Sequence, residues 1–142
     1  MESLNLKEDI HLFCVKAKSF PEGIDGAQQE LASLPLAYSD RSHFGVSYMH
    51  DNEIIYFAAA ELKANEAIPA GCTTYTLKSG KYISTYIRNF RKNISQISAA
   101  FEQMISDPRI DKNGCCAEWY LPEGSDHKSA IDVRCMVRLA DD

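Results

Sequence analysis

The sequence lacks the two features that would direct the chain to a membrane. Its 142 residues contain no uninterrupted apolar run of about 18, the length that a membrane-spanning helix needs. The amino terminus, Met1 to Asn5, has no basic region followed by an apolar stretch, so we expect no signal peptide. We therefore expect a cytoplasmic protein with no membrane partner, folded as a single domain over residues 1–142.

Motifs that bind metals, phosphates or redox cofactors are missing as well. The five cysteines form no C-x-x-C pair, and the four histidines never occur as H-x-H or H-E-x-x-H. Without a secretion signal, an odd number of cysteines indicates reduced thiols, most of them small core residues. We therefore expect no metal site and no cofactor. The cysteines are Cys14, Cys72, Cys115, Cys116 and Cys135, and the histidines are His11, His43, His50 and His127.

Positive charge is scarce, with 15 Lys and Arg against 20 Asp and Glu and a net charge of −5. This balance does not favour a surface for duplex nucleic acid, where Lys and Arg neutralise phosphates. The one basic cluster is Arg88, Arg91 and Lys92, which we interpret as a solvated loop before a helix. The first predicted strand begins at Ile10, which leaves too few residues before it for a helix-turn-helix unit. We therefore expect no direct DNA binding.

What the sequence does contain is an order of strands and helices that occurs twice. In the first half, a strand-like run at 10–20 precedes apolar residues at helical spacing over 24–34. Alternating residues at 44–49 and an apolar run at 54–62 follow. The turn signal Asp51-Asn52 separates these two runs, which predicts a β-hairpin.

The second half has the same order of elements. Its elements are a strand run at 73–87, a helix at 94–105, a strand at 115–121 and a strand at 131–139. Corresponding elements of the two halves lie 70 or 71 residues apart, although few residues are identical. We interpret the chain as two β-α-β-β pseudo-repeats, at about 10–62 and 73–139.

Two such repeats predict an α+β fold, in which a curved antiparallel sheet carries both helices on one face. Alternation in the strand at 115–121 places Ala117 and Trp119 on one face, and Glu118 and Tyr120 on the other. We expect the helices to cover the apolar face. Glu118 and Tyr120 would then line a ligand groove on the face without helices.

These elements resemble the GyrI-like small-molecule-binding domain. The motifs that carry the resemblance are Gly80-Lys81-Tyr82, which opens the second half, and Glu118-Trp119-Tyr120, which precedes the last strand. That domain, built from SHS2-type repeats, is the effector-binding module of some AraC-type and MerR-type regulators. The resemblance covers about Ile10 to Leu139 and implies two helices on one face of the sheet and a groove on the other. It also implies a pocket that contains Glu118 and Tyr120.

The resemblance implies three kinds of function. The first is binding of a small hydrophobic, often cationic, effector or foreign compound, in transcription regulation or detoxification. The second is hydrolysis of reactive cyclopropane-bearing compounds, with Glu118 as the general base. The third is a protein-interaction module with a partner protein, such as a modulator of a topoisomerase.

Aromatic side chains complete the predicted site, because tyrosine offers an apolar wall with a polar tip. The predicted ligand-binding residues are Glu118, Tyr120, Tyr82, Tyr86, Trp119 and Tyr48. A cationic ligand stacked on Tyr120 would neutralise Glu118. The residues leave an alternative open: Arg134 or Arg138 on the neighbouring strand could form a cross-strand ion pair with Glu118.

Overall fold

A computed structural model describes residues 1–38 and 40–141 of the chain, with eight strands and two α-helices in this part. The strands are β1 (Glu2–Leu6), β2 (Ile10–Lys16), β3 (His43–His50), β4 (Glu53–Glu61), β5 (Thr73–Leu77), β6 (Gly80–Ile87), β7 (Cys116–Leu121) and β8 (Asp132–Arg138). The α-helices are α1 (Ile24–Ala32) and α2 (Ile94–Ile105), and short 3₁₀ helices span Pro35–Tyr38 and Phe90–Lys92. Neither α-helix is long and apolar enough to cross a membrane.

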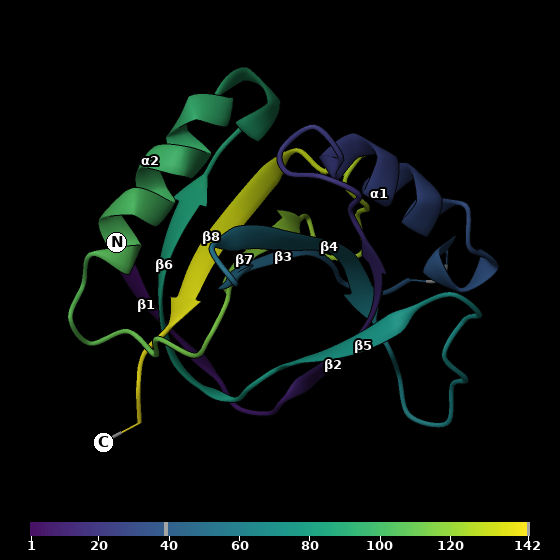
Figure 1. The fold of residues 1–142 in the computed structure, drawn as a ribbon, viewed down its shortest axis with the longest axis horizontal. Helices are drawn as coiled ribbons and strands as arrows, with labels where there is room; N and C mark the ends of the chain where they lie inside the picture. The colour runs from purple at the N-terminus through teal and green to yellow at the C-terminus, as the bar shows by residue number, and fades with distance from the viewer. Residues whose placement is uncertain (39, 142) are drawn as a thin grey trace.

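The strands form one antiparallel sheet in the order β1-β6-β8-β7-β3-β4-β2-β5. Figure 1 shows that this sheet curls into a half-barrel, with α1 and α2 on its outer surface. The predicted α+β class, curved antiparallel sheet and helices on one face are therefore confirmed. The β3–β4 hairpin turns at Asp51 and Asn52, whose positive φ angles of 49° and 66° suit the tight turn that the sequence predicts.

The sequence analysis was wrong to begin the first strand at Ile10, because a strand precedes it. β1 begins eight residues before Ile10 and pairs with β6, from Glu2 opposite Ser84 to Leu6 opposite Gly80. Likewise β5 pairs with β2 and not with β6, which follows it in the chain. Each end of the sheet is thus completed by a strand from the other half of the chain. Such long-range pairing leaves no local pattern in a five-residue strand.

The two helices cover the flanks of the sheet and leave its centre bare. α1 packs mainly against β2 and β4, where Ala27 and Leu31 are buried with Phe13 and Tyr56. α2 packs mainly against β6 and β8, where Met104 is buried. The central strands β7 and β3 lie between these two contacts, so a space remains above them on the side of the helices.

Apolar side chains are buried on both faces of the sheet. The concave face, inside the half-barrel, holds a core that includes Phe44, Val46 and Ala117, with Trp119 packed against it. The convex face holds two further clusters, one under each helix. Both faces of the sheet are therefore covered by apolar side chains. Ala117 and Trp119, the apolar residues of β7, belong to the concave core and do not face the helices, contrary to the sequence-based expectation.

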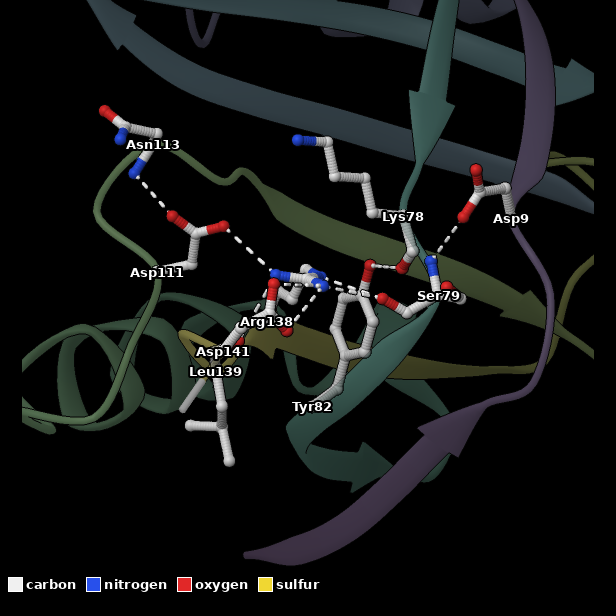
Figure 2. A network of polar contacts seen from close by, with 9 residues as sticks. All are labelled: Asp9, Lys78, Ser79, Tyr82, Asp111, Asn113, Arg138, Leu139 and Asp141. Atoms are coloured by element: carbon white, nitrogen blue, oxygen red, sulfur yellow. Dashed lines mark hydrogen bonds and ion pairs between the residues drawn. The ribbon is translucent and has the colours of Figure 1, made fainter.

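A polar network holds the end of β8 against the neighbouring loops (Figure 2). Arg138 donates through Nε and Nη2 to the carbonyl oxygen of Ser79, at 3.0 and 2.8 Å. Its Nη1 lies 3.3 Å from the Asp111 carboxylate, and its Nη2 lies 3.1 Å from that of Asp141. Asp9 accepts a hydrogen bond from the Ser79 amide at 2.7 Å. The network joins the β5–β6 turn to the loop before β7.

We expect Arg138→Met to lower the free energy of unfolding by about 1–2 kcal/mol, because the Ser79 carbonyl and the Asp111 carboxylate both lose their donor. Urea denaturation followed by circular dichroism measures this change. Arg109→Met is the control, since Arg109 pairs with Asp107 on the surface, where its side chain is 65% exposed. An exposed pair of this kind contributes little to stability, so we expect a much smaller change for the control. Equal losses in the two variants would contradict the role given to Arg138.

Candidate ligand-binding site

A cavity of about 1140 Å³ lies on the convex side, between the two helices and above the bare centre of the sheet. Its floor comes from β7 and β3, where Glu118 stands directly opposite Gly45 in the antiparallel register. One wall is formed by Ile24 and Asp25 of α1. The other is formed by α2, with Ile97 and Phe101 among its residues.

The part of the cavity that holds Glu118 therefore lies on the face that carries the helices. The prediction that Glu118 lines a groove on the face without helices is wrong. The alternating sets along each strand were assigned correctly, but their pairing across the two last strands was reversed. Glu118 is opposite Cys135, and Trp119 is opposite Arg134. Directly opposed residues of an antiparallel pair share a face. Glu118 thus lies on the face of the apolar Cys135.

The same register shows that a cross-strand ion pair of Glu118 with either arginine is wrong. Arg134 lies on the concave face, with its guanidinium 5.3 Å from the centre of the Tyr86 ring. Arg138 has its charge partners in Asp111 and Asp141. Across residues 1–38 and 40–141, the structure holds no hydrogen bond or ion pair to the Glu118 carboxylate.

Glu118 is a half-buried carboxyl group with no counter-charge among the described residues. Burial raises its pKa from the usual 4.5 to about 7, since the low-polarity surroundings disfavour the charged form. At neutral pH the group is therefore divided between its neutral and ionised forms. A cation placed near it would favour the ionised form.

Two tyrosine hydroxyls lie above Gly45, next to Glu118. Gln28 of α1 donates a hydrogen bond to the Tyr56 hydroxyl at 2.9 Å, and the hydroxyls of Tyr56 and Tyr120 lie 3.3 Å apart. A Cβ atom at position 45 would lie 2.5 Å from the Tyr56 hydroxyl and 2.9 Å from the Tyr120 hydroxyl. Position 45 therefore requires glycine, because the two tyrosine hydroxyls fill the space that any larger side chain would need.

We expect Gly45→Ala to destabilise the fold by about 1–2 kcal/mol, since the added methyl group forces the two phenols out of a packed core. Thermal and urea denaturation measure the change. Gly26→Ala is the matched control, because a Cβ atom at Gly26 of α1 meets nothing within 4 Å. Alanine there should be neutral or stabilising by about 0.5–1 kcal/mol. The steric explanation would be contradicted if Tyr56→Phe, which removes the nearest oxygen, failed to reduce the cost of Gly45→Ala.

The ring of Tyr120 is held between two other rings. His127 meets it edge-on, with centroids 5.1 Å apart and an interplanar angle of 82°, and Phe90 lies 5.9 Å away. Arg91 donates to the carbonyl oxygen of His127 and covers the Phe90 ring at 4.9 Å. Arg91 therefore fixes the loop that carries His127 beside the cavity. Tyr120 itself is only 1% exposed.

The mouth of the cavity is apolar, and its charge is on balance acidic. Phe20, Met49, Ile54, Ile94 and Ile105 line it, although they are large hydrophobic residues that are 38–63% exposed. Such exposure of adjoining apolar side chains is typical of a binding surface. The charged lining residues are the acids Asp25, Glu102, Asp111 and Glu118 and the bases Arg91 and Lys112.

The sequence analysis predicts six ligand-binding residues. Three of them line the cavity: Glu118, Tyr120 and Tyr48. The other three lie on the concave face. The ring of Trp119 packs 5.2 Å from that of Phe44. Tyr82 donates to the carbonyl oxygen of Lys78 at 2.6 Å, and Tyr86 donates to the Asp132 carboxylate at 2.5 Å.

Sequence reasoning missed Gly45, Tyr56, Gln28 and His127. Gly45 carried a usable signal, because a glycine inside an apolar strand often marks a close approach by another group. Tyr56 and Gln28 are far from β7 in the sequence and reach the site only through the pairing of β3 with β4 and β7. His127 belongs to a polar loop in which no pattern singles it out.

Metal and thiol chemistry receive no support at this site. The described residues contain no group of three or more His, Cys, Asp or Glu side chains placed to hold a metal ion. Cys116 lines the cavity, but burial raises the pKa of its thiol to about 11. The thiol therefore stays protonated at neutral pH, where it is a weak nucleophile.

No protein-family model matches the chain, and no curated protein matches it. Solved structures do share its fold. An integron cassette protein from Vibrio cholerae, VCH_CASS2, superposes with a TM-score of 0.68 at 11% identity, over 98% of this chain and 95% of that one. A protein named SAV2435, solved bound to tetraphenylphosphonium, has a TM-score of 0.65 at 15% identity, over 99% and 94% of the two chains.

A hydrolase encoded by lin2189 from Listeria innocua superposes as well, with a TM-score of 0.61 at 9% identity, over 98% of this chain and 91% of that one. These TM-scores establish a common fold along nearly the whole chain, and identities this low show the fold alone. They leave the function to be argued from the residues of the cavity.

Proposed function

We propose that this protein binds lipophilic organic cations in the cavity between α1 and α2. The observation that carries the proposal is Glu118, a half-buried carboxyl group at the floor of a mostly apolar cavity, for which the part of the chain that the structure describes offers no counter-charge. An ionised carboxylate in such a place is unfavourable unless a positive charge accompanies it. A cationic ligand would provide that charge and cover the exposed apolar rim.

The apolar part of the ligand would rest on the helices. Tyr120 is almost fully covered by Phe90 and His127, so it offers little free ring surface. Phe101 of α2 and Phe20 before α1 are more accessible, and both line the cavity. Bulky cations with delocalised charge lose little hydration on entering such a site, and aromatic faces attract them.

Two further lines of evidence support this proposal. SAV2435, which shares the fold, was solved with the lipophilic cation tetraphenylphosphonium. The resemblance to the GyrI-like domain also points to Glu118 and Tyr120 as pocket residues. In this interpretation the chain serves as an effector-binding module or sequesters foreign compounds.

The test uses two ions of the same shape and opposite charge. Tetraphenylphosphonium and tetraphenylborate bury nearly the same apolar area, so a difference in affinity reports the charge preference of the cavity. We expect calorimetric titration at pH 8 to detect binding of the cation and no binding, or much weaker binding, of the anion. Equal affinity for the two ions would refute a cation site.

A second candidate function is hydrolysis of a strained or electrophilic small molecule. The specific observation in its favour is a carboxyl group with a pKa of about 7 next to the hydroxyls of Tyr56 and Tyr120. Such a carboxylate can take a proton from water as the water oxygen attacks a ring carbon, while a phenol donates a proton to the opened ring. Turnover of activated cyclopropanes by the wild-type protein, abolished in Glu118→Gln, would support it. Binding without turnover would exclude it.

A further inference from the structure

The cavity continues beyond the point where the two central strands stop pairing. β3 and β7 are paired from Phe44 opposite Trp119 to Ser47 opposite Cys116. Further along β3, the cavity is lined by residues of both faces, Met49 on the convex side and Tyr48 on the concave side. A cavity that touches both faces of one strand must wrap around the end of the β3–β7 pairing.

The far compartment of the cavity has an aromatic lining. Tyr48 and Tyr75 are stacked there, with centroids 6.0 Å apart and an interplanar angle of 20°, and Phe57 lies 6.1 Å beyond Tyr48. Cys115, 8% exposed, lines the same compartment. The exposed side chain of Asn113 stands at its outer edge. Rings and a thiol of this kind suit an uncharged planar group.

The loop that closes this compartment is held in place by hydrogen bonds. The Asp111 amide donates to the Arg138 carbonyl oxygen at 2.9 Å, and the Asp111 carboxylate is paired with the Arg138 guanidinium. The Asp111 carboxylate in turn accepts a hydrogen bond from the Asn113 amide at 3.0 Å (Figure 2), and the Asp111 carbonyl oxygen accepts one from the Gly114 amide, also at 3.0 Å. The negative charge nearest the compartment is thus already paired with Arg138, and the loop that forms its wall is preorganised.

We propose that the Tyr48–Tyr75 compartment is a second subsite, which takes an uncharged aromatic ring of a ligand whose cationic group lies at Glu118. This inference rests on the proposed function and adds the shape of the ligand. Tyr48 lies three residues along β3 from Gly45, the partner of Glu118, a distance of about 10 Å. The favoured ligand is therefore elongated, with a cationic head and an aromatic ring joined by an apolar spacer of about this length.

The test separates ring recognition from general hydrophobicity. Phenylalkyl trimethylammonium ions with spacers from ethyl to octyl are titrated below the concentration at which they aggregate. Each is compared with the alkyl trimethylammonium ion of the same carbon number. We expect no advantage of the phenyl group at the shortest spacer and an advantage of roughly three- to tenfold in Kd at the longest, when the ring reaches the tyrosines.

Variants of the tyrosines locate the ring. Tyr75→Leu should remove the advantage of the phenyl group, and Tyr75→Phe, which keeps the ring, should retain it. Tyr48→Leu repeats the test should Tyr75→Leu fold poorly, as judged by its melting curve. A phenyl advantage that is absent at every spacer length, or that survives both leucine variants, overturns the second subsite.

The proposed cation site has a separate readout in the same series. Replacing the ammonium nitrogen by carbon gives a neutral analogue of each probe, and its affinity reports the contribution of the charge. A phenyl advantage with no preference for the charged head would support the subsite and overturn the cation site. A charge preference without a phenyl advantage would do the reverse. No binding by any member of the series would overturn both.

Discussion

Glu118→Gln is expected to weaken the binding of tetraphenylphosphonium roughly thirtyfold at pH 8, the change that corresponds to about 2 kcal/mol. At this pH most of the carboxyl group is ionised, because its pKa is about 7. Glutamine keeps the size of the side chain and removes the charge. The loss therefore measures the attraction between the carboxylate and the cation in a partly desolvated site, where such pairs are stronger than on an open surface.

The control is Glu102→Gln, which removes a charge from the rim of the same cavity. Glu102 lies on α2 and is exposed, so solvent and salt screen its field. We expect a change in Kd of twofold or less, given the small contribution of exposed charges. In addition, Glu118→Gln should narrow the difference in affinity between tetraphenylphosphonium and tetraphenylborate. A loss of the same size in both variants would mean that only the overall negative potential of the cavity matters.

The order of the elements was predictable from the sequence because it depends on local patterns. The helical spacing over 24–34 corresponds to α1, and the Asp51-Asn52 turn signal lies at the tip of the β3–β4 hairpin. These signals act over a few residues and do not depend on the rest of the chain. The two β-α-β-β pseudo-repeats remain an interpretation of that order. The sheet order agrees with them, because β7, β8 and β6 follow one another outward from the centre of the sheet on one side, as β3, β4 and β2 do on the other.

The side on which the cavity lies was not predictable in the same way. Alternation sorts the residues of β7 into two sets, and it cannot say which set faces the helices when both faces of a sheet are buried. That choice depends on the register of β7 with β8, in which Glu118 is opposite Cys135. A shift by one residue would reverse it. The assumption that the more polar set of β8 shares the face of Glu118 was therefore the step that failed.

Residues that complete the site from a distance carried even less signal. Tyr56 and Tyr120 are 64 residues apart, yet their hydroxyls lie 3.3 Å from each other. They meet because Gly45, between them in the sheet, has no side chain. Tyr56 alone is typical of a sheet core. Only the folded arrangement shows that the three form one unit beside Glu118.

The stability of the unliganded protein should depend on pH through Glu118. Below about pH 4.5 the carboxyl group is protonated in both the folded and unfolded chains, and it has no effect. Between the usual pKa of 4.5 and the folded-state pKa of about 7, the unfolded chain releases the proton while the folded chain holds it. Unfolding is then favoured as the pH rises. Above pH 7 both states are ionised and the cost stays constant.

The size of this cost follows from the shift in pKa, at about 1.4 kcal/mol for each pH unit. A fully desolvated group would lose about 3 kcal/mol, and we expect about 2 kcal/mol because Glu118 is only half-buried. Glutamine resembles the protonated form at every pH. The free energies of unfolding of wild type and Glu118→Gln should therefore agree near pH 4.5 and diverge by about 2 kcal/mol at pH 8, with the variant more stable.

Urea denaturation of both proteins across this range of pH tests the expectation. His127 lies beside the same cavity, and its pKa is lowered by burial and by Arg91. It is present in both proteins, so its effect cancels in the difference. Saturating tetraphenylphosphonium should reverse the trend for wild type, because a bound cation stabilises the ionised carboxylate and its affinity rises with pH. Parallel stability curves for the two unliganded proteins would show that Glu118 keeps an ordinary pKa, and the strongest reason for a cation in this cavity would then be lost.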